Sequence, residues 1–208
     1  MDSLYAKDLE APHEWTEAIK RYIPEELHYN GSFDLMGYLI NDLKSPNIEI
    51  YVGKGGTYTP FHIDVCGSQG HNLMVATEND ASSLWIMAGA QDVHAARRFI
   101  DENSSEELSS DLDNSMLNLE QMSNFPNRFF LFEQNLGDFV FVPSQSMHSV
   151  INLGAGLTTK LSWNITTPKS LFHTITHFSP LYRSIFKGES YRNKAMVFHT
   201  FEKWSASL

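Results

Sequence analysis

Short runs of β-branched, aromatic and alternating apolar residues fill the middle of the chain, separated by polar or glycine-containing turns. Successive side chains of a strand point to opposite faces, and β-branched and aromatic residues pack well on such a surface. The pattern predicts strands at residues 48–52, 57–65, 72–77 and 84–89, and in the segments FFLFEQ, DFVFVP, SVINL and TTKLSWNIT.

Helical patterns lie on both sides of this block. Residues 13–45 are expected to be mainly helical, with a break at Pro24 and a second helix at 33–43, and the tail from Pro168 carries apolar residues at helical spacing. Many short strands flanked by helices favour a mainly β fold, a barrel or jelly roll, over alternating βαβ units. We expect one domain over 1–208, consisting of a helical part (1–47), a barrel (48–165) and C-terminal helices (168–208).

Residues 101–127 interrupt the barrel pattern after a predicted helix at 91–100. They are rich in Ser, Asn, Asp and Glu, and such a composition buries too little apolar area to offset the entropy of ordering. We expect an acidic insertion, with one helical turn around Met116–Met122, whose first part, 101–124, is poorly ordered or extends away from the barrel. A short helix that closes over the pocket as a lid is the alternative.

The net charge of the chain limits the classes of molecule that we expect it to bind. The chain has 208 residues with 25 acidic and 15 basic side chains, for a net charge of −10. An acidic surface repels DNA phosphates and anionic lipid, so neither is an expected partner. A basic peptide would suit this charge, although acidic surfaces also serve solubility alone. The single cysteine, Cys66, and the absence of a secretory signal or a long apolar run predict a nuclear or cytoplasmic protein without a membrane span.

The segment Thr59-Pro60-Phe61-His62-Ile63-Asp64 is the most informative for chemistry. In a strand, His62 and Asp64 share a face, and His148 follows a second buried strand that begins at Gly137-Asp138. Two imidazoles and one carboxylate form the facial triad that binds non-haem iron(II). Each histidine alone is equally well explained as a core residue, whereas the combination is more specific.

Four segments resemble the Jumonji C family: LYAKD, YVGKGGTYTPFHID, NLMV and GDFVFVPSQSMHSVINLG. They span about residues 4–165, and the acidic insertion has no match. The stretch YTPFHID is most similar to the histone lysine demethylase branch, while Asn152, four residues after His148, is equally similar to the hydroxylase branch. The resemblance implies a double-stranded β-helix, jelly-roll or cupin-like, with iron(II) and the cosubstrate 2-oxoglutarate inside.

The resemblance also assigns roles to individual residues. It implies that Thr59 and Asn72 contact the cosubstrate and that Tyr51 lines a methyl-lysine channel at the catalytic site, although packing on a strand explains Tyr51 equally well. The metal ligands that it implies are His62, Asp64 and His148.

One position departs from the family pattern. Aligning LWIMAG with the strand after the HxD pair places Ser82 where the family usually has a lysine that pairs with the far carboxylate of 2-oxoglutarate. Lys160 is a replacement, because it lies at a position that faces the cosubstrate in the family and shares its strand face with Thr158 and Ser162. The alternative is that Lys160 points outward on an edge strand.

The resemblance therefore predicts an iron(II)- and 2-oxoglutarate-dependent oxygenase that demethylates a methyl-lysine, with a basic histone tail as its protein substrate in the nucleus. The missing lysine keeps a second hypothesis open, a chromatin-binding module with little turnover. A protein hydroxylase is a third. The apolar residues of the C-terminal helices suggest a helix–barrel contact or a homodimer.

Overall fold

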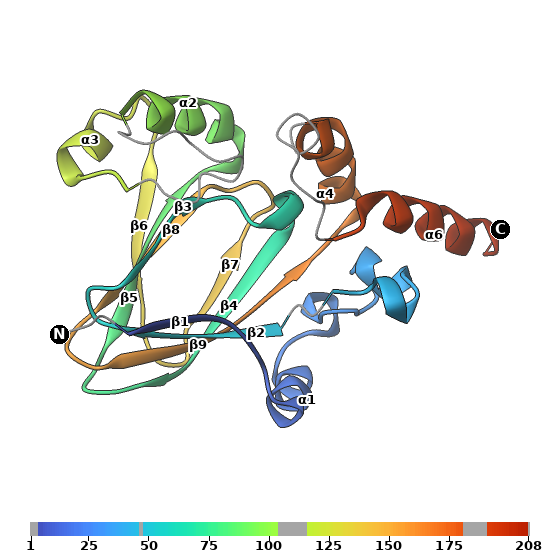
Figure 1. The fold of residues 1–208 in the computed structure, drawn as a ribbon, viewed down its shortest axis with the longest axis horizontal. Helices are drawn as coiled ribbons and strands as arrows, with labels where there is room; N and C mark the ends of the chain where they lie inside the picture. The colour runs from blue at the N-terminus through green and yellow to red at the C-terminus, as the bar shows by residue number, and fades with distance from the viewer. Residues whose placement is uncertain (1–3, 46–47, 104–115, 181–190, 208) are drawn as a thin grey trace.

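The computed structural model describes residues 4–45, 48–103, 116–180 and 191–207, which form two antiparallel sheets with helices on their outer sides (Figure 1). The five-stranded sheet contains, in spatial order, β1 (Tyr5–Glu10), β2 (Ile48–Lys54), β9 (Leu157–Ile165), β4 (Gln69–Thr77) and β7 (Phe139–Val142). The four-stranded sheet contains β3 (Tyr58–His62), β8 (His148–Leu153), β5 (Ser82–Ala88) and β6 (Phe129–Gln134).

The helices surround the sheets. The α-helices are α1 (His13–Tyr22), α2 (Val93–Asn103), α3 (Leu119–Ser123), α4 (Pro168–His173) and α6 (Asn193–Ser205). Short 3-10 helices are η1 (Glu25–Leu27), η2 (Leu35–Tyr38), η3 (Asn41–Leu43), η4 (Val65–Gly67) and η5 (Ala90–Asp92), and η6 (Thr174–Phe178) is a π-helix. In Figure 1, α2 and α3 lie together at one end of β6, and α4 and α6 lie on the opposite side of the molecule. None of the described helices is long and apolar enough to cross a membrane.

Side-chain alternation divides the core into an interior and an exterior. One apolar cluster joins strands of both sheets and therefore lies between them; its members are Trp85, Met87, Val140, Val142 and Val150. On β9, Leu161, Trp163 and Ile165 instead pack against Ile19 of α1, on the outer face of the five-stranded sheet. The residues of β9 that alternate with these three are thereby left facing the interior.

The structure confirms a mainly β fold with flanking helices, and a strand forms in each predicted strand segment. It adds β1, whose pairing with β2 shifts register between Ala6 and Leu9. Two predictions change. The strand expected at 57–65 ends at His62, and no ladder joins the two sheets into a closed barrel among the strands that the structure describes.

The helix expected at 33–43 is replaced by the two short turns η2 and η3. The buried carboxylate of Asp34 fixes the start of η2, since it accepts hydrogen bonds from the backbone amides of Asn30 (2.8 Å), Met36 (3.1 Å) and Thr166 (2.9 Å). These bonds tie the segment to the residue that follows β9. The backbone becomes extended at Leu39 and Ile40, which ends η2 and separates it from η3, so no continuous helix forms.

The predicted insertion is only partly described, because residues 104–115 lie outside the described part of the chain. The helical turn expected near its end is confirmed as α3. Its flanks do not extend away from the sheets, because Leu117 and Phe125 are buried in the core that also contains Ile100 of α2. Apolar side chains at these two positions anchor the end of the insertion despite its polar composition.

Candidate active site

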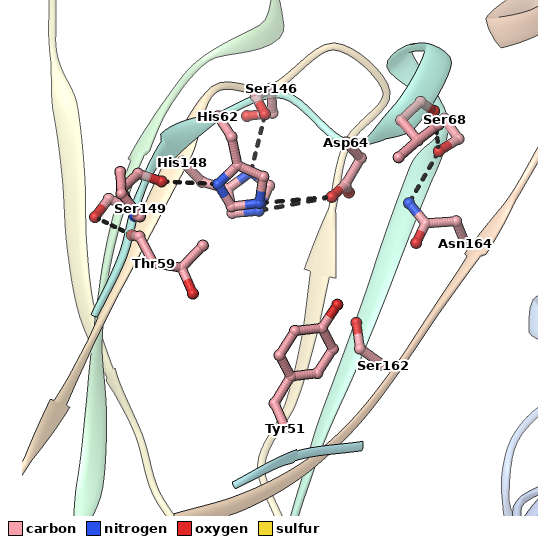
Figure 2. A network of polar contacts seen from close by, with 12 residues as sticks. Tyr51, Thr59, His62, Asp64, Ser68, Ser146, His148, Ser149, Ser162 and Asn164 are labelled. Atoms are coloured by element: carbon pink, nitrogen blue, oxygen red, sulfur yellow. Dashed lines mark hydrogen bonds and ion pairs between the residues drawn. The ribbon is translucent and has the colours of Figure 1, made fainter. Parts of the chain in front are cut away.

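The three side chains predicted as metal ligands lie close together at one end of the space between the two sheets. His62 ends β3 and His148 begins β8, and the two are direct partners in the β3–β8 ladder, with ring centroids 4.1 Å apart. The Oδ1 atom of Asp64 lies 3.9 Å from Nε2 of His62 and 3.8 Å from Nε2 of His148 (Figure 2). In the part of the chain that the structure describes, this is the one group of three His, Cys, Asp or Glu side chains whose ligand atoms lie within 4.8 Å of one another.

The backbone presets both imidazoles for metal binding. Nδ1 of His62 donates to the carbonyl of Pro60 (2.8 Å), and Nδ1 of His148 donates to the carbonyl of Ser146 (3.1 Å). Because a carbonyl only accepts, each ring carries its proton on Nδ1 and presents the Nε2 lone pair. Burial lowers the pKa of His148 to about 4, so its ring is neutral near pH 7, as a ligand must be.

Asp64 lies beyond the end of β3, at the start of η4, and needs support from the neighbouring sheet. Burial raises the pKa of its carboxyl, while His62 and a hydrogen bond from the Asn164 side chain lower it. The absence of a side chain at Gly70 is equally important, because a Cβ there would lie 2.1 Å from Oδ2 of Asp64. Gly70 on β4 therefore makes room for the carboxylate, a role that the sequence did not predict.

A register shift brings Thr59 to the same side as His62. The two are three residues apart and would face opposite ways in a regular strand. Thr59 pairs with Val150, whereas His62 pairs with His148, so three steps on β3 match two on β8. This bulge turns Thr59 toward the cavity, where its Oγ1 lies 2.6 Å from the hydroxyl of Tyr5 on β1.

Lys160 is buried, with 2% of its surface exposed, and lines the cavity on β9. This strand lies between β2 and β4, so the edge-strand alternative is wrong. The ammonium donates to Oδ1 of Asn152 and to Oγ1 of Thr158 (3.1 Å). Burial lowers the pKa of Lys160 to about 7. In the described residues, no carboxylate forms an ion pair with it.

Asn152 is the centre of this polar network. Besides Lys160 and Thr158, its Oδ1 accepts from the hydroxyl of Ser83 (3.0 Å), and its Nδ2 donates to Thr57 (2.8 Å). Ser83 shares a strand face with Trp85 and faces the interior, whereas Ser82 points away and donates to Glu133. The interior position on β5 is therefore occupied by Ser83 and not, as the alignment indicated, by Ser82. Both are serines, so the strand still lacks a positive charge there.

Asn72 lines the cavity from β4 and is fixed from behind by Gln134. Nε2 of Gln134 donates to Oδ1 of Asn72 (3.0 Å), and Oε1 of Gln134 accepts from the indole of Trp85 (2.8 Å). The Trp85 ring in turn stacks on His148, with centroids 5.6 Å apart and planes inclined by 20°. Asn72 and His148 are thus connected through two residues that the sequence did not single out, Gln134 and Trp85.

Tyr51 rises from β2 toward the space in front of the metal ligands (Figure 2). Its hydroxyl donates to carboxylate oxygens of Asp8 (2.7 Å) and Glu49 (3.0 Å). Asp8 reaches it because the register shift of β1 lies opposite Tyr51 and gives Asp8 a positive φ of 56°. Tyr51 is consequently part of a polar cluster rather than a simple packing residue.

One cavity of about 520 Å³ collects all seven residues that the sequence proposed for the site. They are Tyr51, Thr59, His62, Asp64, Asn72, His148 and Lys160. The same cavity is also lined by Tyr5, Asp8, Glu49 and Trp85, which the sequence analysis did not select. Trp85 could have been found from its strand phase, but Tyr5 and Asp8 lie on a strand that was not predicted.

Comparison with known proteins agrees with this arrangement. The family described as "JmjC domain, hydroxylase" matches residues 49–164, from the second residue of β2 to the penultimate residue of β9. A similar protein is "C-module-binding factor A" of Dictyostelium discoideum, which is 35% identical over 202 residues. That match covers 96% of this chain but only 20% of the relative, so the chain corresponds to about a fifth of that protein.

Proposed function

Because the chain belongs to the JmjC domain family, we propose that it is an iron(II)- and 2-oxoglutarate-dependent oxygenase acting on a protein side chain. The two facing sheets are assigned to the double-stranded β-helix of that family. The donor set fits the metal, since two imidazoles and one carboxylate leave further positions open for a cosubstrate and oxygen. When bound, iron(II) would activate dioxygen as the oxidant for hydroxylation of a C–H bond, and 2-oxoglutarate would be oxidised to succinate and CO₂ in the same reaction.

The observation that carries the proposal is the pairing of this triad with an uncompensated cation in one cavity. A buried ammonium needs a partner anion, and none of the described residues gives Lys160 one. A dicarboxylate that chelates the metal at one end and meets Lys160 at the other provides that charge. Lys160 thereby takes the place of the lysine that β5 lacks.

The chain's own groups complete the cosubstrate site. Thr59 and Asn72 provide hydrogen-bond donors beside the metal, while Trp85 and Val150 cover it with apolar surface. Excluding water strengthens the interactions of a charged ligand with these donors. This set orients the cosubstrate and leaves the side of Tyr51 free for the substrate.

The negative charge around Tyr51 favours a cationic substrate. Tyr51 lies between the carboxylates of Asp8 and Glu49, and the tyrosine ring and the two acids together suit a methylated ammonium group. With the net charge of −10, this supports a lysine of a basic histone tail as the substrate. Hydroxylation of an N-methyl group gives a hemiaminal, which releases formaldehyde and leaves the amine with one methyl group fewer.

The test combines iron-loaded protein, 2-oxoglutarate and histone peptides with mono-, di- or trimethylated lysine. We expect succinate, formaldehyde and a peptide lacking one methyl group, in equal amounts, and none of these with His62→Ala. Succinate together with a peptide that gains one oxygen atom would assign a protein hydroxylase instead. Failure of the wild type to bind 2-oxoglutarate in calorimetry would favour the module with little turnover.

Charge-neutral variants test the substrate assignment. Asp8→Asn combined with Glu49→Gln should raise KM for the cationic peptide by about tenfold or more, with little change in 2-oxoglutarate affinity. An unchanged KM would contradict the role of these carboxylates. Localisation in the nucleus follows from a histone substrate and is tested by imaging the tagged protein.

A homodimer is the proposed assembly. Phe198, Phe201 and Trp204 of α6 are exposed, and burying them against a second copy would remove this apolar area from water. We expect Phe198→Ser with Phe201→Ser to convert a dimer to a monomer in light scattering. A wild type that is already monomeric at high concentration would exclude the dimer.

A further inference from the structure

Gln134 connects the two sheets, and the proposed function gives this residue no role. It is the last residue of β6 in the four-stranded sheet, it is fully buried, and its side chain reaches Asn72 in the five-stranded sheet. Both ends of its amide are hydrogen-bonded, because Oε1 accepts from Trp85, and Nε2 donates to Oδ1 of Asn72 (3.0 Å) and to the backbone carbonyls of Asp138 (3.2 Å) and Asn72 (3.4 Å). An amide with a donor facing its oxygen and acceptors facing its nitrogen has one stable orientation.

The direction of this hydrogen-bond chain is fixed at its start. The indole nitrogen of Trp85 can only donate, so the atom of Gln134 that faces it must be the oxygen. The Gln134 NH₂ group then faces Asn72, and the atom of Asn72 that meets it must again be the oxygen. Trp85 thus donates to Gln134, and Gln134 donates to Asn72. Neither amide can turn over without losing its hydrogen bond while Trp85 stays in place.

The Nδ2 amino group of Asn72, which ends this series of hydrogen bonds, faces the cavity. Asn72 is nearly buried and lines the cavity, and no described residue accepts a hydrogen bond from its Nδ2. We propose that Gln134 is a positioning residue that holds the Asn72 amide with its NH₂ group toward the cavity, so that the site presents donors to an anionic ligand. This rests on the proposed function for the identity of the anion, 2-oxoglutarate, but not for the orientation of Asn72.

Two substitutions separate this role from simple packing. Gln134→Met keeps the volume and removes the bond to Asn72, so the amide is free to turn. Gln134→Glu keeps the shape, but its carboxylate only accepts, so Asn72 must reverse and present its oxygen to the cavity. Once protonated, the carboxyl group of this variant can donate again through its hydroxyl, and burial raises the pKa of a carboxyl. An orienting role therefore predicts that acid restores the effect of Gln134. Repulsion between the carboxylate and the anion acts in the same direction, so the orientation of Asn72 must also be measured without the cosubstrate.

The first measurement is the affinity of the Mn²⁺-loaded protein for 2-oxoglutarate between about pH 6 and pH 9. Relative to wild type at each pH, Gln134→Met should bind about threefold more weakly at every pH. Gln134→Glu should bind about tenfold or more weakly at high pH and recover toward wild type as the pH falls. Gln91→Glu, the same change at an exposed position, serves as the control and should match wild type.

The second measurement needs no cosubstrate. In ¹⁵N NMR of the metal-free protein, the Asn72 NH₂ hydrogens of wild type should exchange with water because they face the cavity. In Gln134→Glu at high pH they should exchange more slowly by about tenfold or more, because the carboxylate holds them.

The two measurements distinguish the proposals. If wild type does not bind 2-oxoglutarate, the proposed function fails and the exchange of the Asn72 hydrogens alone decides the orientation. Equal exchange in wild type and Gln134→Glu, or a loss of affinity that is the same at every pH, would overturn the positioning role. If Gln134→Glu does not fold, the test rests on Gln134→Met. An affinity of that variant for 2-oxoglutarate equal to that of wild type would also overturn the positioning role.

Discussion

Replacing Lys160 by Met is the sharpest test of the anion site, because it predicts opposite effects on stability and on binding. The methionine keeps most of the aliphatic stem and removes the ammonium. Asn152 keeps its bonds from Ser83 and Thr158, so no buried acceptor loses all its partners. The variant therefore isolates the charge.

The size of the stability effect follows from the lowered pKa. A pKa lowered from 10.5 to about 7 means that burial disfavours the ammonium by about 5 kcal/mol. The unfolded chain binds this proton more tightly than the folded protein between these two pKa values, so stability rises with pH in that window. At pH 7, the cost of Lys160 to the metal-free protein is about 4 kcal/mol by this linkage, and by about pH 9 it falls to about 2 kcal/mol.

Losing two hydrogen bonds offsets part of this gain, at about 1 kcal/mol each. Lys160→Met should therefore be more stable than wild type by about 2 kcal/mol near pH 7, with the difference close to zero near pH 9. Binding should change in the opposite sense, since 2-oxoglutarate loses a charge-assisted bond worth about 2 kcal/mol or more.

Urea denaturation of the metal-free proteins and calorimetry of the Mn²⁺-loaded proteins, each from about pH 6 to pH 9, provide the assay. Wild-type affinity for 2-oxoglutarate should fall as the pH rises above about 7, because an unprotonated Lys160 must first take up a proton. Tyr5 and Tyr51 do not interfere, because burial raises the pKa of each phenol. A variant less stable than wild type at pH 7, or one that binds 2-oxoglutarate with unchanged affinity, would refute the reasoning.

Three further substitutions test the metal site and its support. His62→Ala should abolish stoichiometric iron binding, measured by metal analysis, while circular dichroism stays unchanged; unchanged iron content would remove His62 from the ligand set. Gly70→Ala should weaken metal binding by about 10- to 100-fold, because its Cβ would lie 2.1 Å from Asp64, whereas Gly89→Ala meets only a flexible side chain and should bind normally. Asp34→Ala should lower the free energy of unfolding by about 3 kcal/mol, since three backbone amides lose their acceptor, and a loss below about 1 kcal/mol in urea denaturation would contradict that account.

Local sequence patterns were enough to predict each described strand except β1, and they also indicated which residues of a strand share a face. Alternation is a property of neighbouring residues, so the inward direction of Lys160 could be predicted without knowledge of the partner strands. His62 and Asp64 do meet as expected, but Asp64 lies beyond the end of β3, so strand alternation is not the reason. The motif around His62 and the strand before His148 also identified the family. Each of these inferences depends on residues close together in the chain.

Which strand faces lie against one another is decided only by the tertiary structure. The bulge that turns Thr59 inward depends on pairing between β3 and β8, and the carboxylate of Asp8 reaches Tyr51 through a strand that sequence patterns did not predict. The contact of Gln134 with Asn72 likewise joins strands far apart in the chain, and that of Lys160 with Asn152 joins consecutive strands that lie in different sheets. The register between distant strands follows from packing and bulges across the whole sheet, and a shift of one residue would send each of these side chains to the opposite face.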